Sequence, residues 1–138
     1  MTLEISRTPT TEEISQLTAF FPKLCSPGFK PIREWGGGQP DERGVRQFPY
    51  PIYEPVVREF FHLAAQEQWC DFDYRSKNAS QMLQEPNFIE QCSLDEIKTM
   101  LTFSTRGERF CDGHWGMMIE KGFICRILKR LQVITHQK

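Results

Sequence analysis

The stretch YEPVVREFFHLA at residues 53–64 predicts the helix around which the rest of the chain packs. Pro55 stands in its first turn, where the missing N–H of proline costs no hydrogen bond. The apolar side chains that follow share one broad face, and they are Val56, Val57, Phe60, Phe61, Leu63, Ala64 and, further on, Trp69. Because other elements must cover so broad an apolar face, we interpret this stretch as the central helix.

Apolar residues at helical spacing predict further helices on both sides of this stretch. They are expected over residues 12–24, 78–85, 94–106, 112–121 and 123–133. Ser93 and Asp112 are the expected N-caps of two of them, and Gly122 is expected to take the left-handed conformation that ends a helix. The helices should pack around Phe60, Phe61, Leu101, Trp115, Ile127 and Leu128.

Residues 29–50 differ in character, because proline, glycine and charged residues separate their apolar side chains. Strands over 29–35 and 44–50, joined by a long loop, would form a β-hairpin whose hydrogen-bond ladder Pro31 and Pro49 interrupt. The predicted fold is therefore mainly α (α+β), with about five packed helices and a small irregular β-hairpin near residues 29–50. We expect one globular domain over residues 1–138, with residues 1–9 as a flexible tail.

Composition narrows the classes of protein that this chain can belong to. A hydrophobic fraction of 39% with 11 Phe in 138 residues predicts a packed core. The formal net charge is -1, and basic residues are only mildly enriched in the last third of the chain. A nucleic-acid-binding domain usually carries a much stronger basic footprint, so we do not expect a nucleic acid as the partner.

Localisation and redox state are also predicted from the sequence. No apolar run approaches the roughly 18 residues of a membrane span, and residues 1–11 lack the basic and apolar regions of a secretory signal. We therefore expect a cytoplasmic protein that does not enter a membrane. The five cysteines form no CxxC pair, which predicts reduced thiols, and Cys111 is expected to be a small buried side chain.

The densest polar segment, TRGERFCDGHW at residues 105–115, lies between two predicted helices. In the structural interpretation its charges cap helix ends, and its arginines bridge to Glu108, Glu54 or helix C-termini. In a functional interpretation Arg106 and Arg109 offer forked donors to a carboxylate or phosphate, and His114 exchanges a proton near neutral pH. Trp35, Tyr50 and Tyr53 would supply flat walls where the hairpin meets this segment.

These residues predict a binding or interaction module for a small anionic ligand or an acidic peptide, without a cofactor. A thiol enzyme is a weaker alternative, in which the dipole of a helix N-terminus and His114 activate Cys111, against the opposing charge of Asp112. A metal-dependent enzyme would require two more ligands, and the remaining cysteines and His62 show no metal-site spacing, so no metal is expected. A DNA-binding regulator is weaker still, because the helix at 112–121 presents few charges to a groove.

Two segments together resemble a bacterial family of small proteins classed as a domain of unknown function. The first is WGGG at 35–38 followed by GVRQFPYPIY at 44–53, and the second is RFCDGH at 109–114 followed by Gly122, Leu128 and Leu131. The resemblance spans about residues 29–131. It implies one compact domain and brings no activity with it.

Overall fold

The computed structural model describes residues 7–136 and confirms a mainly helical fold with one small antiparallel sheet. Its helices are α1 (Thr11–Thr18), α2 (Phe21–Leu24), α3 (Pro55–Ala64), α4 (Ala79–Leu83), α5 (Pro86–Ile89), α6 (Leu94–Arg106), α7 (His114–Glu120) and α8 (Phe123–His136). The strands are β1 (Ile32–Gly36) and β2 (Tyr50–Tyr53), and single 3-10 turns occupy Glu67–Trp69, Tyr74–Ser76 and Gly107–Arg109. Within this part of the chain, no helix is both long and apolar enough to cross a membrane.

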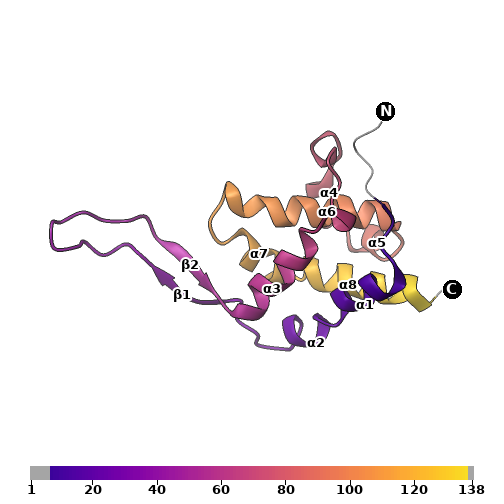
Figure 1. Ribbon diagram of the computed structural model, residues 1–138, viewed down its shortest axis with the longest axis horizontal. Helices are drawn as coiled ribbons and strands as arrows, with labels where there is room; N and C mark the ends of the chain where they lie inside the picture. The colour runs from indigo at the N-terminus through magenta and orange to yellow at the C-terminus, as the bar shows by residue number, and fades with distance from the viewer. Residues whose placement is uncertain (1–6, 137–138) are drawn as a thin grey trace.

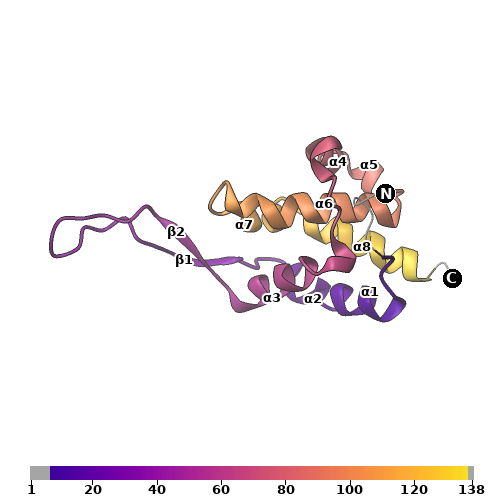
Figure 2. The ribbon, with the colours of Figure 1, turned by 45° about the horizontal axis from the view of Figure 1, so that its top comes forward.

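The helices enclose a hydrophobic core, and Figures 1 and 2 show how they are arranged. Helix α6 runs beside α8, with α1–α3 beneath them and α4 and α5 above them in Figure 2. Helix α3 contacts α1, α2 and α6, while α8 contacts α1, α2, α5, α6 and α7. The expected core residues Phe60, Phe61, Leu101, Ile127 and Leu128 are buried, and Trp115 packs partly buried against them. The predicted central helix therefore shares its role with α8.

Local signals account for most helix ends. Ser93 caps α6 as predicted, with Glu96 completing a capping box, and Gly122 has the positive φ of 83° expected after α7. The prediction of one helix over residues 12–24 was wrong, because the chain breaks at Ala19 and Phe20 into α1 and α2. Pro22 explains the break, since it has no N–H to continue the hydrogen bonds of α1.

The second strand lies later in the sequence than the predicted 44–50. The register pairs Ile32 with Tyr53 and Gly36 with Tyr50. The buried ring of Tyr53 fixes that register, because a shift by one residue would turn this side chain to solvent. Residues 37–49 instead form the outer part of an arm that projects from the helices in both ribbon views (Figures 1 and 2).

The cysteines depart from the prediction in two ways. Cys25 and Cys125 form a disulfide across a sequence separation of 100, with their Cα atoms 5.9 Å apart. The neighbouring Leu24 and Ile124 are buried in the core, and their burial brings α2 against α8. The expectation that all five thiols are reduced was therefore wrong. The expectation that Cys111 is buried was also wrong, because its side chain is exposed.

The predicted flexible tail lies mostly outside the described residues, which begin at Arg7. The guanidinium of Arg7 donates to the Glu13 carboxylate at 2.7 Å through Nη1, and the carbonyl of Arg7 accepts a hydrogen bond from Lys98 Nζ at 3.1 Å. Pro9 is buried. The chain is thus attached to α1 and α6 just before the first helix.

Candidate functional site

Glu108 organises the segment that the sequence singles out. Its Oε1 accepts from the Tyr53 hydroxyl and from Trp115 N–H, both at 2.8 Å, and its Oε2 accepts from Gly113 N–H at 2.9 Å. The carboxylate therefore lies at the N-terminus of α7, where a negative charge is favoured. The prediction that Asp112 caps this helix was wrong, because Gly113 is the N-cap and its φ of 89° lets Glu108 reach the first turn.

The hairpin meets this segment at its base. A Cβ atom on Gly113 would lie 3.1 Å from Cη2 of Trp35, so the indole packs directly on that glycine. The ring of Tyr53 lies 5.5 Å from that of Trp115. Tyr50 lies over Gly36, within the hairpin itself. Of the three predicted aromatic walls, Trp35 and Tyr53 therefore reach the 105–114 segment.

The two predicted arginines lie apart from this contact. The guanidinium of Arg106 lies 5.4 Å from the ring centre of Tyr74, and Arg109 is exposed. Among residues 7–136 neither of them forms an ion pair. Glu54 pairs with Arg33 at 3.0 Å, so the expected ion pairs of Arg106 and Arg109 with Glu54 or Glu108 are not observed. Arg106 does lie in the last turn of α6, at the helix C-terminus that the structural interpretation also named.

His114 is the predicted site residue with the most unusual surroundings. The residue has a relative exposure of only 8%, and its ring packs edge-on against Phe103. The ring also lies against Gly107, where an added Cβ would be 2.3 Å from Nε2. Nε2 is buried and has no hydrogen-bond partner within the described residues. Burial lowers the pKa of this imidazole, and the Glu108 carboxylate partly opposes that shift.

His114 lines a cleft of about 720 Å³ that α4, α6, α7 and the start of α8 enclose. The lining residues are Ser80, Leu83, Gln84, Pro86, Phe103, His114, Met117, Met118, Lys121, Phe123 and Arg126. Lys121 and Arg126 make this lining cationic, since it contains no aspartate or glutamate. A volume of this size is typical of small-molecule sites, roughly 300–1,000 Å³.

Sequence reasoning missed Glu108, Lys121 and Arg126 as parts of this region. Arg126 forms a basic stripe on the last helix together with Lys129 and Arg130, and such a stripe ordinarily faces solvent. The signal that could have identified it is Gly122, whose turn between α7 and α8 brings Lys121 and Arg126 to the same side of the cleft. Two partners of Glu108 are the nearby N–H groups of Gly113 and Trp115, but its third partner, Tyr53, lies 55 positions away in β2 and has no local signal.

The geometry gives no support to the thiol or metal alternatives. The thiol of Cys111 donates to the carbonyl of Asp112 at 3.9 Å and not to His114. No group of three His, Cys, Asp or Glu side chains within the described part of the chain is arranged to hold a metal ion.

Comparison with known proteins places the chain in a family without assigning it a reaction. No curated protein and no solved structure matches it. A family model described as a family of unknown function matches residues 9–137. Because this match covers nearly the whole sequence, the chain belongs to that family, DUF6508.

Proposed function

We propose that this protein is a binding module for a small anionic ligand and that the His114 cleft is its site. The observation that carries the proposal is a cleft lined by two cations and no carboxylate, with the largely buried His114 in its wall. The Nε2 atom of His114 has no hydrogen-bond partner within residues 7–136. A buried polar group without a partner is costly, so a ligand that satisfies it gains affinity. The cleft retains His114 from the residues predicted by sequence and adds Lys121 and Arg126.

The lining also indicates the chemistry of the ligand. Arg126 lies in the first turn of α8, where its forked donors and the helix dipole both favour a carboxylate or a phosphate. Phe103, Met117 and Phe123 supply apolar surface beside these cations. We therefore infer a ligand with an anionic group and an apolar body of about the size of one aromatic ring.

Isothermal titration with phenyl phosphate tests the proposal, with inorganic phosphate and benzyl alcohol as probes of the two halves of the ligand. Phenyl phosphate should bind more tightly than either half, and Arg126→Gln should weaken it about tenfold, the loss expected for one charge-assisted contact of 1.4 kcal/mol. Lys129→Gln on the same helix is the matched control, because Lys129 does not line the cleft. Equal affinity in the wild type and Arg126→Gln would reject the site.

The pH dependence supplies a second readout. A bound anion favours protonated His114 and so raises its lowered pKa, and binding should therefore tighten as the pH falls. Benzenesulfonate suits this measurement, since its own charge is constant across the neutral range. His114→Gln should remove the pH dependence, and a slope retained in that variant would exclude His114 as the group that responds to the ligand.

A further inference from the structure

A second surface, separate from the cleft, alternates aromatic rings with guanidinium groups. Its members, which we call the Arg–Phe patch, are Phe72, Tyr74, Arg75, Arg106 and Phe110. The Arg106 guanidinium carbon lies 6.0 Å from the ring centre of Phe72 and 5.4 Å from that of Tyr74. The Arg75 guanidinium carbon lies 5.8 Å from Tyr74 and 6.0 Å from Phe110. Tyr74 is thus the shared centre of two cation–π contacts.

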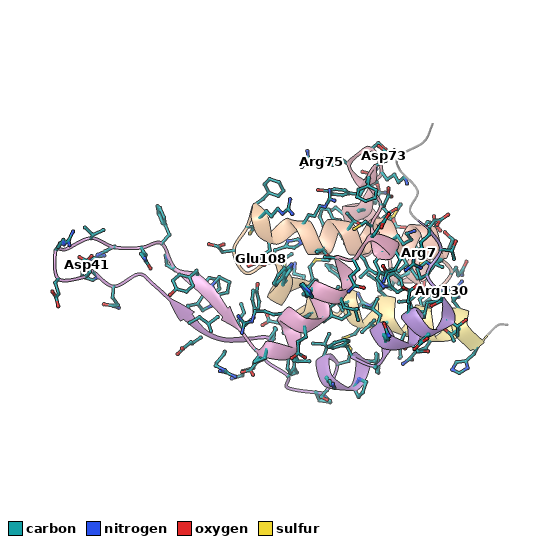
Figure 3. The ribbon with its side chains drawn as sticks, in the orientation of Figure 1. Arg7, Asp41, Asp73, Arg75, Glu108 and Arg130 are labelled. Atoms are coloured by element: carbon teal, nitrogen blue, oxygen red, sulfur yellow. A yellow bond between two sulfur atoms is a disulfide. The ribbon has the colours of Figure 1, made fainter. Side chains whose placement is uncertain are left out.

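The outer rings of the patch face solvent. Phe72 is 50% exposed and Phe110 is 73% exposed, while Tyr74 between them is only 7% exposed. Exposed phenylalanine beside arginine is typical of protein interfaces, where both residue types are enriched. Arg75 is labelled in Figure 3, on the turn above α6 and on the far side of the molecule from α1 and α2.

Stacking holds both guanidiniums in place, and their charges are not neutralised. None of the ion pairs among the described residues includes Arg75 or Arg106. The nearby carboxylate of Asp71 is already bound by Lys77 at 2.8 Å and by Thr99 at 2.6 Å. Arg75 Nε also donates to the Tyr74 hydroxyl at 3.4 Å, which leaves the terminal N–H groups of this guanidinium for a ligand. A guanidinium that is already held in place loses little freedom when it binds a carboxylate.

We propose that the Arg–Phe patch docks an acidic, apolar peptide segment of a protein partner. Carboxylates of that segment pair with Arg75 and Arg106, and its apolar side chains cover Phe72 and Phe110. Charge complementarity and the exposed rings carry this assignment, since an interface gains most from arginine and aromatic residues that become buried. The surface is independent of the His114 cleft, so either proposal can fail alone.

A peptide fits this surface better than a single-stranded nucleic acid does. Nucleic-acid grooves follow a regular backbone with a continuous row of cations, whereas this patch supplies two stacked arginines on a protein of net charge -1. Asp73 and Asp112 lie within two positions of Phe72 and Phe110 in the sequence. A peptide can place neutral residues beside these carboxylates, whereas a nucleic acid carries a phosphate at every nucleotide.

Fluorescence anisotropy tests the proposal with three labelled probes. They are a short peptide that alternates Glu with Leu or Phe, the same peptide with Gln in place of Glu, and oligo(dT). The Glu peptide should bind, added salt should weaken it, and the Gln peptide should bind at least tenfold more weakly. Absence of Glu-peptide binding, equal binding of the Gln peptide or stronger binding of oligo(dT) would overturn the proposal.

Variants locate the binding on the patch. Arg106→Gln and Arg75→Gln should each reduce affinity about tenfold, and Phe110→Ser should reduce it while leaving the melting temperature nearly unchanged, because this ring is exposed. Arg58→Gln is the matched control, since Arg58 is an exposed arginine on α3. Wild-type affinity in both patch arginine variants, with melting temperatures showing folded protein, would place the binding elsewhere.

Discussion

Glu108 links the hairpin to the first turn of α7 through one carboxylate. The Tyr53 hydroxyl donates to this carboxylate and accepts a hydrogen bond from the N–H of Gly116 at 3.3 Å. Strand β2, Glu108 and α7 therefore form one connected hydrogen-bond network. Burial and the hydrogen bond to Glu108 both raise the pKa of Tyr53, which keeps its hydroxyl protonated as a donor. At the scale of single residues, this network is structural.

Replacing Glu108 with alanine should destabilise the fold. The change leaves two N–H groups and the Tyr53 hydroxyl without their acceptor, at a cost of about 1–3 kcal/mol. The melting temperature should fall by roughly 4 °C for each kcal/mol in a chain of this size. Asp112→Ala is the control and should have little effect, because Asp112 is exposed and does not cap α7. Equal losses in both variants would contradict the assignment of the cap to Glu108.

His114 should make stability depend on pH. Burial lowers its pKa in the folded protein, so the unfolded chain takes up a proton at a higher pH than the folded chain does. The stabilisation is therefore fully present above the ordinary histidine pKa of about 6.5 and is lost as the pH falls below it. Urea denaturation between pH 8 and pH 5.5 should show this decline.

The matched variants of this experiment are His114→Gln and His62→Gln. In His114→Gln, the free energy of unfolding should fall less steeply as the pH decreases. In His62→Gln, the fall should match that of the wild type, since His62 is exposed on α3. A steep decline that persists in His114→Gln would assign the proton uptake to another group.

At the scale of elements, α7 begins where the chain turns sharply at Gly113. This residue has a φ of 89° and lies beneath the Trp35 indole. The start of the helix therefore depends on the hairpin as well as on its own sequence. Glycine serves both requirements, because a side chain would strain the backbone and press on the ring.

Gly113→Ala should cost more stability than a glycine substitution that affects the backbone alone. Gly28→Ala provides that comparison, since Gly28 has a φ of 80° but no atom within 4 Å of an added Cβ. Both variants lose roughly 1 kcal/mol or more to the left-handed conformation, and Gly113→Ala must also displace Trp35. Thermal denaturation should rank Gly113→Ala as the less stable, and the reverse order would argue against close packing of the indole.

The disulfide acts at the scale of the whole molecule, because it joins cysteines 100 positions apart in a chain of 138 residues. Cys25 on the C-terminal side of α2 and Cys125 in α8 are separated by 100 residues. In the chain-entropy description, a closed loop of that length contributes about 4.7 kcal/mol by restricting the unfolded state. The bond therefore adds to the hydrophobic contacts between α2 and α8.

Cys25→Ser should lower the free energy of unfolding by an amount approaching this value, with Cys111→Ser as a neutral control, since Cys111 is exposed. Thiol titration should find one rapidly reacting group in the native protein. Cys70 and Cys92 should react slowly, because they are buried and burial raises the pKa of each thiol. Five thiols instead of three in the denatured, unreduced protein would show that the disulfide is absent.

Local physics decided the parts of the fold that the sequence predicted. The apolar face of α3, the Ser93 capping box and the left-handed Gly122 each depend on residues within a few positions of one another, so the sequence alone determines them. Pro22 is also a local signal, because a proline inside an apolar helical pattern predicts a break between α1 and α2. Family membership likewise follows from the sequence, since the match covers residues 9–137.

Only the tertiary structure decided the features that join distant segments. The Tyr53–Glu108 hydrogen bond spans 55 positions and the disulfide spans 100, and no local pattern encodes either partner. The cleft likewise depends on the packing of helices that lie apart in the sequence, which brings His114, Lys121 and Arg126 into one lining. The physical reason is that spacing specifies which face of an element is apolar, whereas the side chains that meet across those faces are set by how the faces pack.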